Sequence, residues 1–176
     1  SGGKKIAEYS YINNPSANNQ YYHIGRISKK IETSTIGSNS FSTEEQYAYN
    51  NNLLTQQKVK GNGTSWNTET FQYDVFGNVK QRTLSANGVA SRTEIFKYDP
   101  SGRFLIESTD IEGLKTKFTY GRFGNPLTTT NPYNQKTTFG YDGWNRLTKE
   151  TNYLGKITTF TYERLGIGGL KKTTNY

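Results

Sequence analysis

The feature that most constrains the fold of this chain is a short phrase, aromatic-x-Tyr followed by a turn signal, which recurs through most of its 176 residues. Its copies are anchored at Tyr49, Tyr73, Tyr98, Tyr120, Tyr141 and Tyr162, which gives steps of 24, 25, 22, 21 and 21 residues. Self-similarity at such a period is typical of repeat architectures, in which each copy is one supersecondary unit stacked on its neighbours. The chain is therefore predicted to be a repeat protein.

Each repeat has the pattern of a β-hairpin. The two rings of aromatic-x-Tyr stand two residues apart, so they project from one face of a strand, while the residue between them faces the other way. The Asp-x-x-Gly that follows is typical of a tight turn, because Asp caps backbone amides and Gly accepts a positive φ. A second Asx-x-x-Gly/Asn signal stands at 110–113, 131–134 and 152–155. The predicted fold is all-β, with antiparallel β-hairpin repeats forming a curved meander or strip of β-sheet.

The residues expected to build the repeat are the aromatic pair, the Asp and Gly of the turn, and the Arg or Leu after it. They are Phe71, Tyr73, Asp74, Gly77, Phe96, Tyr98, Asp99, Gly102, Arg103, Phe118, Tyr120, Gly124, Phe139, Tyr141, Asp142, Arg146, Leu147, Phe160 and Tyr162. The rings are expected to stack as a ladder between adjacent repeats. Arg103 and Arg146 are expected to pack near a Tyr ring or a turn carboxylate, a structural use that is favoured over ligand binding.

Composition agrees with strands and a thin core. Hydrophobic residues make up only 31% of the chain, and 14 Tyr and 9 Phe supply much of that share. The absence of Cys excludes disulfides and thiolate metal sites, and no apolar run approaches the length of about 20 residues that spans a bilayer. The net charge of +8 is spread along the chain in short doublets only. Nucleic-acid binding is therefore not expected.

Residues that could carry catalysis or bind metal are few. His23 is the only histidine, so a catalytic triad would depend on it alone and zinc ligation by paired histidines is excluded. All four aspartates, Asp74, Asp99, Asp110 and Asp142, stand at predicted turns, where backbone capping explains them. No catalytic residue, metal or cofactor is predicted, and the chain is not expected to be an enzyme. Glycosidase-like chemistry would need a carboxylate pair assembled by the fold.

The chain divides into three stretches by pattern. Residues 1–3 are interpreted as an expression scar, and residues 4–44 as divergent N-terminal repeats, with a degenerate copy at 21–29 after a loop at 13–19. Residues 45–176 are interpreted as the regular β-hairpin repeats anchored by the aromatic-x-Tyr phrase. A glycosylation sequon at Asn62-Gly63-Thr64 is interpreted as accidental.

The phrase Phe-x-Tyr-Asp-x-x-Gly-Arg/Asn-Leu-Thr resembles the YD repeat of rearrangement-hotspot (Rhs) proteins, whose relatives include shell components of insecticidal Tc toxins and teneurins. Agreement is best at 98–103 and 141–147. Tyr120 is followed by Gly121 and Tyr162 by Glu163, so the capping Asp is missing there and looser or differently built turns are expected. The last repeat also inserts residues at 166–169.

The resemblance implies a fragment of a larger repeat protein, and a non-catalytic structural scaffold. That scaffold would be a segment of the YD-repeat β-shell of a secreted or surface bacterial toxin, or of a wall-associated protein. Its partners would be the remainder of the parent protein and an enclosed toxin domain, with self-association through sheet edges as a further possibility. The family's self-cleavage motif is not recognised, because Arg103 follows Asp99-Pro100-Ser101-Gly102 and this segment has the pattern of a hairpin turn.

The alternative function is a carbohydrate-binding or adhesion module that uses exposed aromatics. Flat rings with polar tips are suited to stacking on sugars. Trp66 and Trp144 are the best candidates for such contacts with a glycan.

Overall fold

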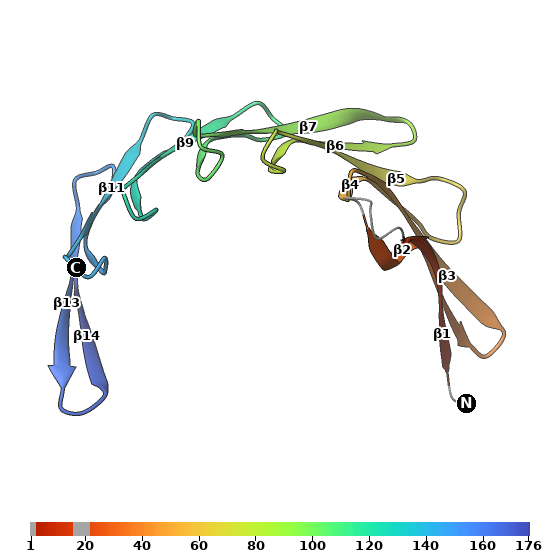
Figure 1. Ribbon diagram of the computed structural model, residues 1–176, viewed down its shortest axis with the longest axis horizontal. Helices are drawn as coiled ribbons and strands as arrows, with labels where there is room; N and C mark the ends of the chain where they lie inside the picture. Colours follow the sequence, from red (N-terminus) through yellow and green to blue (C-terminus); the bar gives the residue numbers. More distant parts are fainter. Residues whose placement is uncertain (1–2, 16–21) are drawn as a thin grey trace. The chain divides into compact units, whose positions relative to one another are not determined.

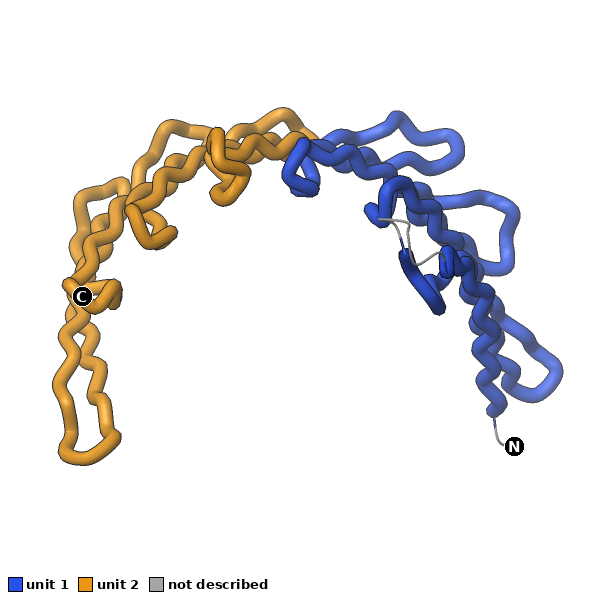
Figure 2. Tube along the Cα trace, viewed as in Figure 1, with its two compact units in different colours: residues 1–94 blue, residues 95–176 orange. Residues whose placement is uncertain are grey.

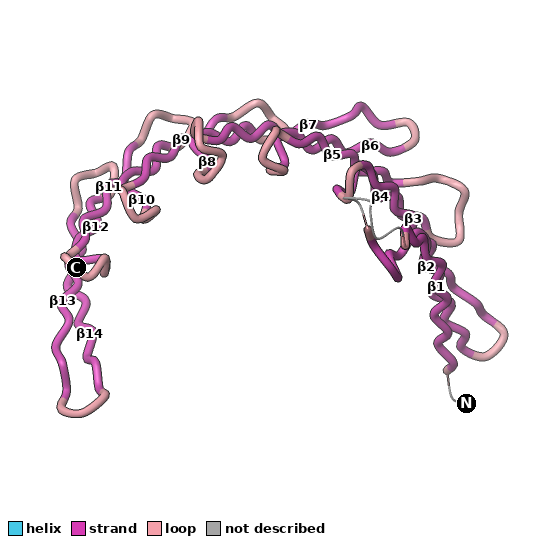
Figure 3. The backbone as a smooth tube through the Cα atoms, in the orientation of Figure 1, coloured by secondary structure: helices cyan, strands magenta, loops and turns pink. Residues whose placement is uncertain are grey.

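The computed structural model describes residues 3–15 and 22–176, and within these ranges the chain forms strands and turns without a helix (Figures 1 and 3). The strands are β1 (Lys4–Asn14), β2 (His23–Ile36), β3 (Asn39–Asn50), β4 (Leu53–Lys60), β5 (Asn67–Tyr73), β6 (Val79–Ala86), β7 (Val89–Tyr98), β8 (Leu105–Thr109), β9 (Lys115–Tyr120), β10 (Pro126–Thr130), β11 (Lys136–Tyr141), β12 (Leu147–Thr151), β13 (Ile157–Leu165) and β14 (Gly169–Asn175).

All of these strands belong to one open sheet, in which they follow one another in chain order from β1 to β14. Neighbouring strands are antiparallel, as in the pairing of β9 with β10 and of β10 with β11. The predicted all-β meander of hairpins is confirmed.

Two compact units divide the chain, residues 1–94 and residues 95–176 (Figure 2). Strand β7 contributes its residues 89–94 to the first unit and 95–98 to the second. The predicted boundary between residues 44 and 45 separates two sequence patterns, and it stays a prediction. Residues 1–2 of the predicted scar and residues 16–19 and 21 of the predicted N-terminal loop and degenerate copy lie outside the described residues.

The second unit has two different faces. One is the aromatic face, which carries Phe118, Tyr120, Phe139, Tyr141, Phe160 and Tyr162; the opposite face carries the residues between the rings, such as Thr119 and Thr161. Strand β9 shows the alternation directly, since Phe118 and Tyr120 are half-buried while Thr119 is exposed.

The predicted ladder of stacked rings is wrong. Phe118 lies opposite Thr129, and Phe139 lies opposite Glu150, so a return strand with polar side chains separates the rings of successive repeats. In the described residues the ring pairs in contact are Tyr9–Tyr11 and Phe104–Tyr120, and neither joins two rings of the predicted stripe. The reason is geometric, because each repeat contributes two strands and only one of them carries the aromatic pair.

The described part of the chain has no buried core, and even the largest aromatic side chains keep contact with solvent. A single layer of sheet leaves both faces open, so the thin core expected from composition does not form. Burial of apolar surface therefore contributes less here than in a two-layer domain, and bonds within and between repeats contribute more of the stability.

Ion pairs connect the strands of the first unit. The Glu44 carboxylate on β3 lies 3.0 Å from the Lys29 ammonium on β2 and 3.1 Å from the Lys60 ammonium on β4. Hydrogen bonds from Gln46, Lys29 and Lys60 lower the pKa of Glu44 to about 2. The Tyr47 hydroxyl donates to the neighbouring Glu45, and this bond raises the pKa of Tyr47 to about 12.

Candidate functional site: the junction between repeats

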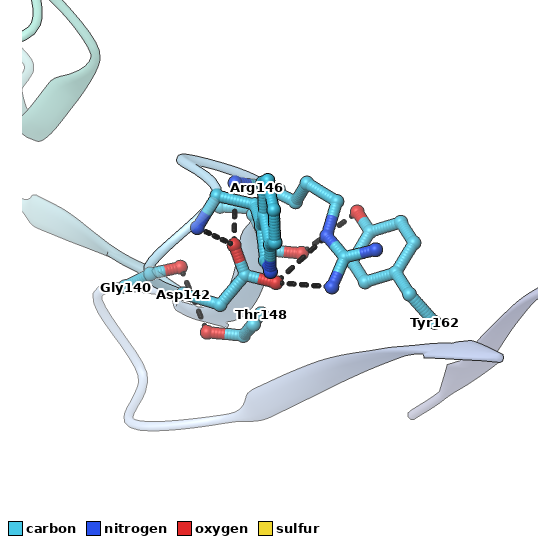
Figure 4. Close-up of polar contacts among 7 residues, drawn as sticks. Gly140, Asp142, Arg146, Thr148 and Tyr162 are labelled. Carbon is cyan, nitrogen blue, oxygen red and sulfur yellow. Dashed lines mark hydrogen bonds and ion pairs between the residues drawn. The ribbon is translucent and has the colours of Figure 1, made fainter. Parts of the chain in front are cut away.

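The turn after Tyr141 shows how a regular hairpin of the repeat closes, with the Asp142 carboxylate beside Arg146 (Figure 4). The Asp142 amide donates to the Arg146 carbonyl at 3.0 Å, and the Asn145 amide donates to the Asp142 carbonyl at 2.9 Å. Carboxylate oxygen Oδ1 of Asp142 accepts the amides of Trp144 and Arg146 at 3.0 and 2.9 Å. Asn145 takes a φ of 60°, the left-handed conformation that such a turn requires.

The same bonds recur in both kinds of turn in the repeat. An Asx oxygen accepts the amides two and four residues further on at Asp74, Asp110, Asn131, Asp142 and Asn152. The fourth position has a positive φ at Gly77, Gly113, Asn134, Asn145 and Gly155. The capping expected of these Asx residues is confirmed, and one turn chemistry serves both ends of the hairpins.

The Arg146 side chain contacts both its own turn, at Asp142, and the anchor tyrosine of the next repeat, Tyr162. Its Nε and Nη2 atoms each lie 2.7 Å from Oδ2 of Asp142, and its guanidinium lies 4.6 Å from the centre of the Tyr162 ring (Figure 4). The Tyr162 hydroxyl donates to the Leu147 carbonyl at 2.9 Å. A hydrogen bond from the Arg146 amide and the ion pair with its side chain lower the pKa of Asp142.

The tyrosine hydroxyl makes the same kind of bond in other copies. Three hydroxyls donate to a backbone carbonyl just after the turn of the preceding repeat: Tyr73 to Leu54 at 2.6 Å, Tyr141 to Pro126 at 2.8 Å and Tyr162 to Leu147 at 2.9 Å. The Tyr49 hydroxyl donates to the Ile27 carbonyl within β2 at 3.0 Å. Burial raises the pKa of the Tyr73 and Tyr141 hydroxyls. This bond, here called the tyrosine link, joins consecutive repeats through a side chain.

A β-bulge accompanies the anchor tyrosine. The register shifts directly before Tyr49, Tyr73, Tyr98 and Tyr141. Bulges increase local twist and redirect a side chain. Sequence reasoning missed both the bulge and the tyrosine link, although one signal was available: the second ring of the pair is Tyr in every copy, whereas the first is Phe in most of them.

The turn that begins at Asp99 is longer than the others. The Asp99 amide donates to the Phe104 carbonyl, so this turn holds one residue more than the turn at Asp142. Phe104 therefore stacks on Tyr120 at 5.0 Å between ring centres, while the Arg103 guanidinium lies 5.2 Å from the Phe104 ring. A hydrogen bond from the Ser101 hydroxyl lowers the pKa of Asp99 to about 2.

Gly121 keeps the ordinary turn although it has no carboxylate. Its amide donates to the Asn125 carbonyl at 2.8 Å, and the Gly124 amide donates to the Gly121 carbonyl at 2.9 Å. Oxygen Oδ1 of Asn125 lies 2.9 Å from the place that a Cβ of residue 121 would take. Of the two expectations for this copy, the looser turn is wrong, because the backbone bonds are kept, whereas the turn is built differently in that the Asn125 side chain fills the space of the missing carboxylate.

Glu163, which follows the anchor Tyr162, does not begin a turn. It lies within β13, and the chain reverses further on, at residues 166–168, before β14. The expectation of a differently built turn is confirmed for this copy.

The two tryptophans have different surroundings and belong to different units. Trp144 is the third residue of its turn and is 84% exposed. Trp66 is half-buried, with the Lys60 ammonium 4.8 Å from its ring centre. The sequon residue Asn62 is engaged by β3, since its side-chain nitrogen donates to the Ser40 carbonyl at 3.2 Å.

Residues 3–15 and 22–176 contain no group of side chains that could form a metal site. His23 lies at the start of β2, and no group of three His, Asp or Glu side chains in these ranges could hold a metal ion. These ranges also contain no helix that is long and apolar enough to cross a membrane.

The sheet and its tyrosine links define an antiparallel β-hairpin repeat protein. Residues 98–136 match the family model described as RHS Repeat, which is the family that the sequence pattern resembles. No curated protein matches the sequence.

Two solved structures show a similar fold. The crystal structure of TcdB2-TccC3 without its hypervariable C-terminal region is similar with a TM-score of 0.62 and 15% identity, over 79% of this chain and 8% of that one. The Photorhabdus luminescens Tc holotoxin pore with a mutated TccC3 gives a TM-score of 0.60 and 15% identity, over 78% and 8%. This chain thus spans a small part of those proteins.

Proposed function

We propose that the chain is a non-catalytic wall segment, in which backbone ladders hold each hairpin to the preceding one and tyrosine links add a side-chain bond at four of the junctions. The observation that carries this proposal is the tyrosine link, which is formed by Tyr49, Tyr73, Tyr141 and Tyr162. In these copies the hydroxyl of the most regular side chain of the repeat is engaged in a structural hydrogen bond. The engagement of Asp74, Asp99, Asp110 and Asp142 in turns supports the same function.

The wall would be part of the shell of a secreted or surface-exposed bacterial toxin-type protein, and the shell would enclose another domain of that protein. The Rhs-repeat match and the fold shared with Tc toxin structures support this proposal. In this role the chain's partners are the rest of the repeat protein and an enclosed toxin domain.

Limited proteolysis of the natural protein that carries this sequence tests the shell. We expect the domain outside the repeats to resist protease in the native protein and to be cleaved once the repeats are unfolded in denaturant. A domain that is cleaved equally fast in both states would overturn the enclosing role.

A second candidate function is glycan binding by exposed rings at the turns. Trp144 is 84% exposed, and Phe123, at the same position of the turn that follows the preceding anchor tyrosine, is 75% exposed. Two strand spacings separate these turns, about 10 Å, which suits stacking on alternate sugars of an extended chain. Saturable quenching of Trp fluorescence by a glycan, lost in Trp144→Ala, would support this function, and unchanged binding in that variant would exclude the site.

A further inference from the structure

A hollow of about 300 Å³ lies in the second unit, between the turn at 110–113 and the turn at 131–134. Its lining includes Leu114, Lys115, Lys117, Thr130, Asn131 and Pro132. The volume is at the lower end of the range for small-molecule sites and suits a ligand of the size of one sugar ring. The lining combines cationic, hydroxyl and apolar groups.

Positive charge is in excess at this hollow. Glu107 is shared by Lys97 at 2.9 Å and Lys115 at 3.7 Å. Lys117 lies opposite Thr130, which in turn lies opposite Lys136, so both lysines flank one hydroxyl on the same face. Glu107 also lies opposite Lys117 in the pairing of β8 with β9, so this one carboxylate faces three lysines, and Lys136 adds a fourth cation to the same face. An anionic group is the ligand that this arrangement favours.

Lys117 also departs from the repeat. The residue three positions before the anchor tyrosine is a threonine in three of the other copies, at Thr70, Thr138 and Thr159, and it is Gln46 or Ile95 in the remaining two. Threonine suits an exposed strand, and the Lys117 side chain is exposed, so β9 can form without a lysine at this position, although Lys117 lies opposite Glu107. Because Lys97 already lies 2.9 Å from Glu107, Lys117 adds a cation beyond the one that this carboxylate needs and is a candidate for binding.

We propose that this hollow binds an acidic sugar of a glycan, either a uronate or a sulfated residue. Lys117 and Lys115 would bind the carboxylate or sulfate, Thr130 would bond a sugar hydroxyl, and Leu114 and Pro132 would contact the apolar face of the ring. The rings of the aromatic pairs lie on the opposite face, which argues against single-stranded nucleic acid, because that ligand relies on base stacking. The site goes beyond the wall function and does not depend on it.

Titration of this chain with an oligogalacturonate, followed by calorimetry, tests the proposal. Lys117→Thr introduces the residue of the other repeats, and we expect it to weaken binding by at least about ten-fold through loss of a charge-assisted bond. The matched control is Lys149→Thr, since Lys149 is exposed on the same face outside the hollow, and its affinity should stay within about two-fold of the parent.

Three outcomes would overturn the proposal. Equal losses in the two variants would indicate unspecific attraction to a basic surface. Tighter binding to single-stranded DNA or to anionic lipid vesicles than to the oligogalacturonate would assign the surface to another ligand. No saturable binding of either an oligogalacturonate or a sulfated oligosaccharide, with the circular dichroism of the folded sheet intact, would exclude an acidic-sugar site.

Discussion

At the scale of single residues, the two rings of each pair have different tasks. The first ring, such as Phe139, lies against the polar residues of the return strand, whereas the second ring, such as Tyr141, carries a hydroxyl that reaches a carbonyl of the preceding repeat. Because no described side chain is fully buried, one hydrogen bond of this kind is a larger share of the contacts between repeats than it would be in a packed core.

Removal of the Tyr162 hydroxyl measures the tyrosine link. In Tyr162→Phe the ring stays under the Arg146 guanidinium, but the Leu147 carbonyl loses its donor. We expect a loss of about 0.5–1.5 kcal/mol in the free energy of unfolding, measured by urea denaturation. Tyr153→Phe, at a tyrosine that is 52% exposed on a turn, is the control and should be neutral. Equal effects of the two substitutions would contradict a stabilising role of the link.

At the scale of strands and turns, the hairpins were predictable from local rules. The alternation of strands such as β9 and the Asx-x-x-Gly pattern act within a few residues, so a single sequence displays them. The turn at Gly121 was not predictable, because a side chain four residues away, Asn125, replaces the missing group. Nor was the extra residue before Phe104, since it depends on which ring reaches Tyr120 in the next repeat.

Restoring the missing cap should stabilise its turn. Gly121 has no positive φ, so Gly121→Asp introduces no backbone strain, and its carboxylate can accept the amides of residues 123 and 125, as Asp74 does in its own turn. We expect a gain of about 0.5–1 kcal/mol in the free energy of unfolding. The Asn125 side chain must rotate away, as its flexible end allows.

The control for this gain is Gly124→Asp in the same turn. Gly124 has a φ of 84°, and an added Cβ would lie 2.9 Å from a ring atom of Phe104, so this variant should be less stable than the parent. If Gly121→Asp were destabilised to the same degree, the Asn125 side chain would be a fixed part of the turn.

Acid should weaken the strands that meet at Glu44. The folded pKa of Glu44 is lowered to about 2 from an ordinary value of 4.5. Its contribution to stability is therefore fully present above pH 4.5 and is lost as the pH falls toward 2. We expect the urea midpoint to fall over this range, and Glu44→Gln to be less stable at neutral pH and less sensitive to acid. Glu8→Gln on exposed β1 is the control, and the acid response should survive it.

At the scale of the whole molecule, the order of strands in the sheet leaves two edges. Each strand from β2 to β13 pairs on both sides, while β1 and β14 each pair on one side within the described residues. An edge strand presents backbone donors and acceptors that another chain can pair with. Local sequence rules predict hairpins but say nothing about what covers such an edge, because the covering strand belongs to a distant or separate segment.

The isolated chain should self-associate through these edges. Ile6 on β1 is 42% exposed and Leu170 on β14 is 58% exposed, and a charge at either position opposes edge pairing. We expect Ile6→Lys with Leu170→Lys to raise the dissociation constant by about ten-fold in sedimentation experiments. Ile111→Lys removes a side chain of similar exposure, 40%, from a turn and should leave association unchanged. If Ile111→Lys weakened association equally, exposed apolar surface in general, and not strand pairing, would hold the copies together.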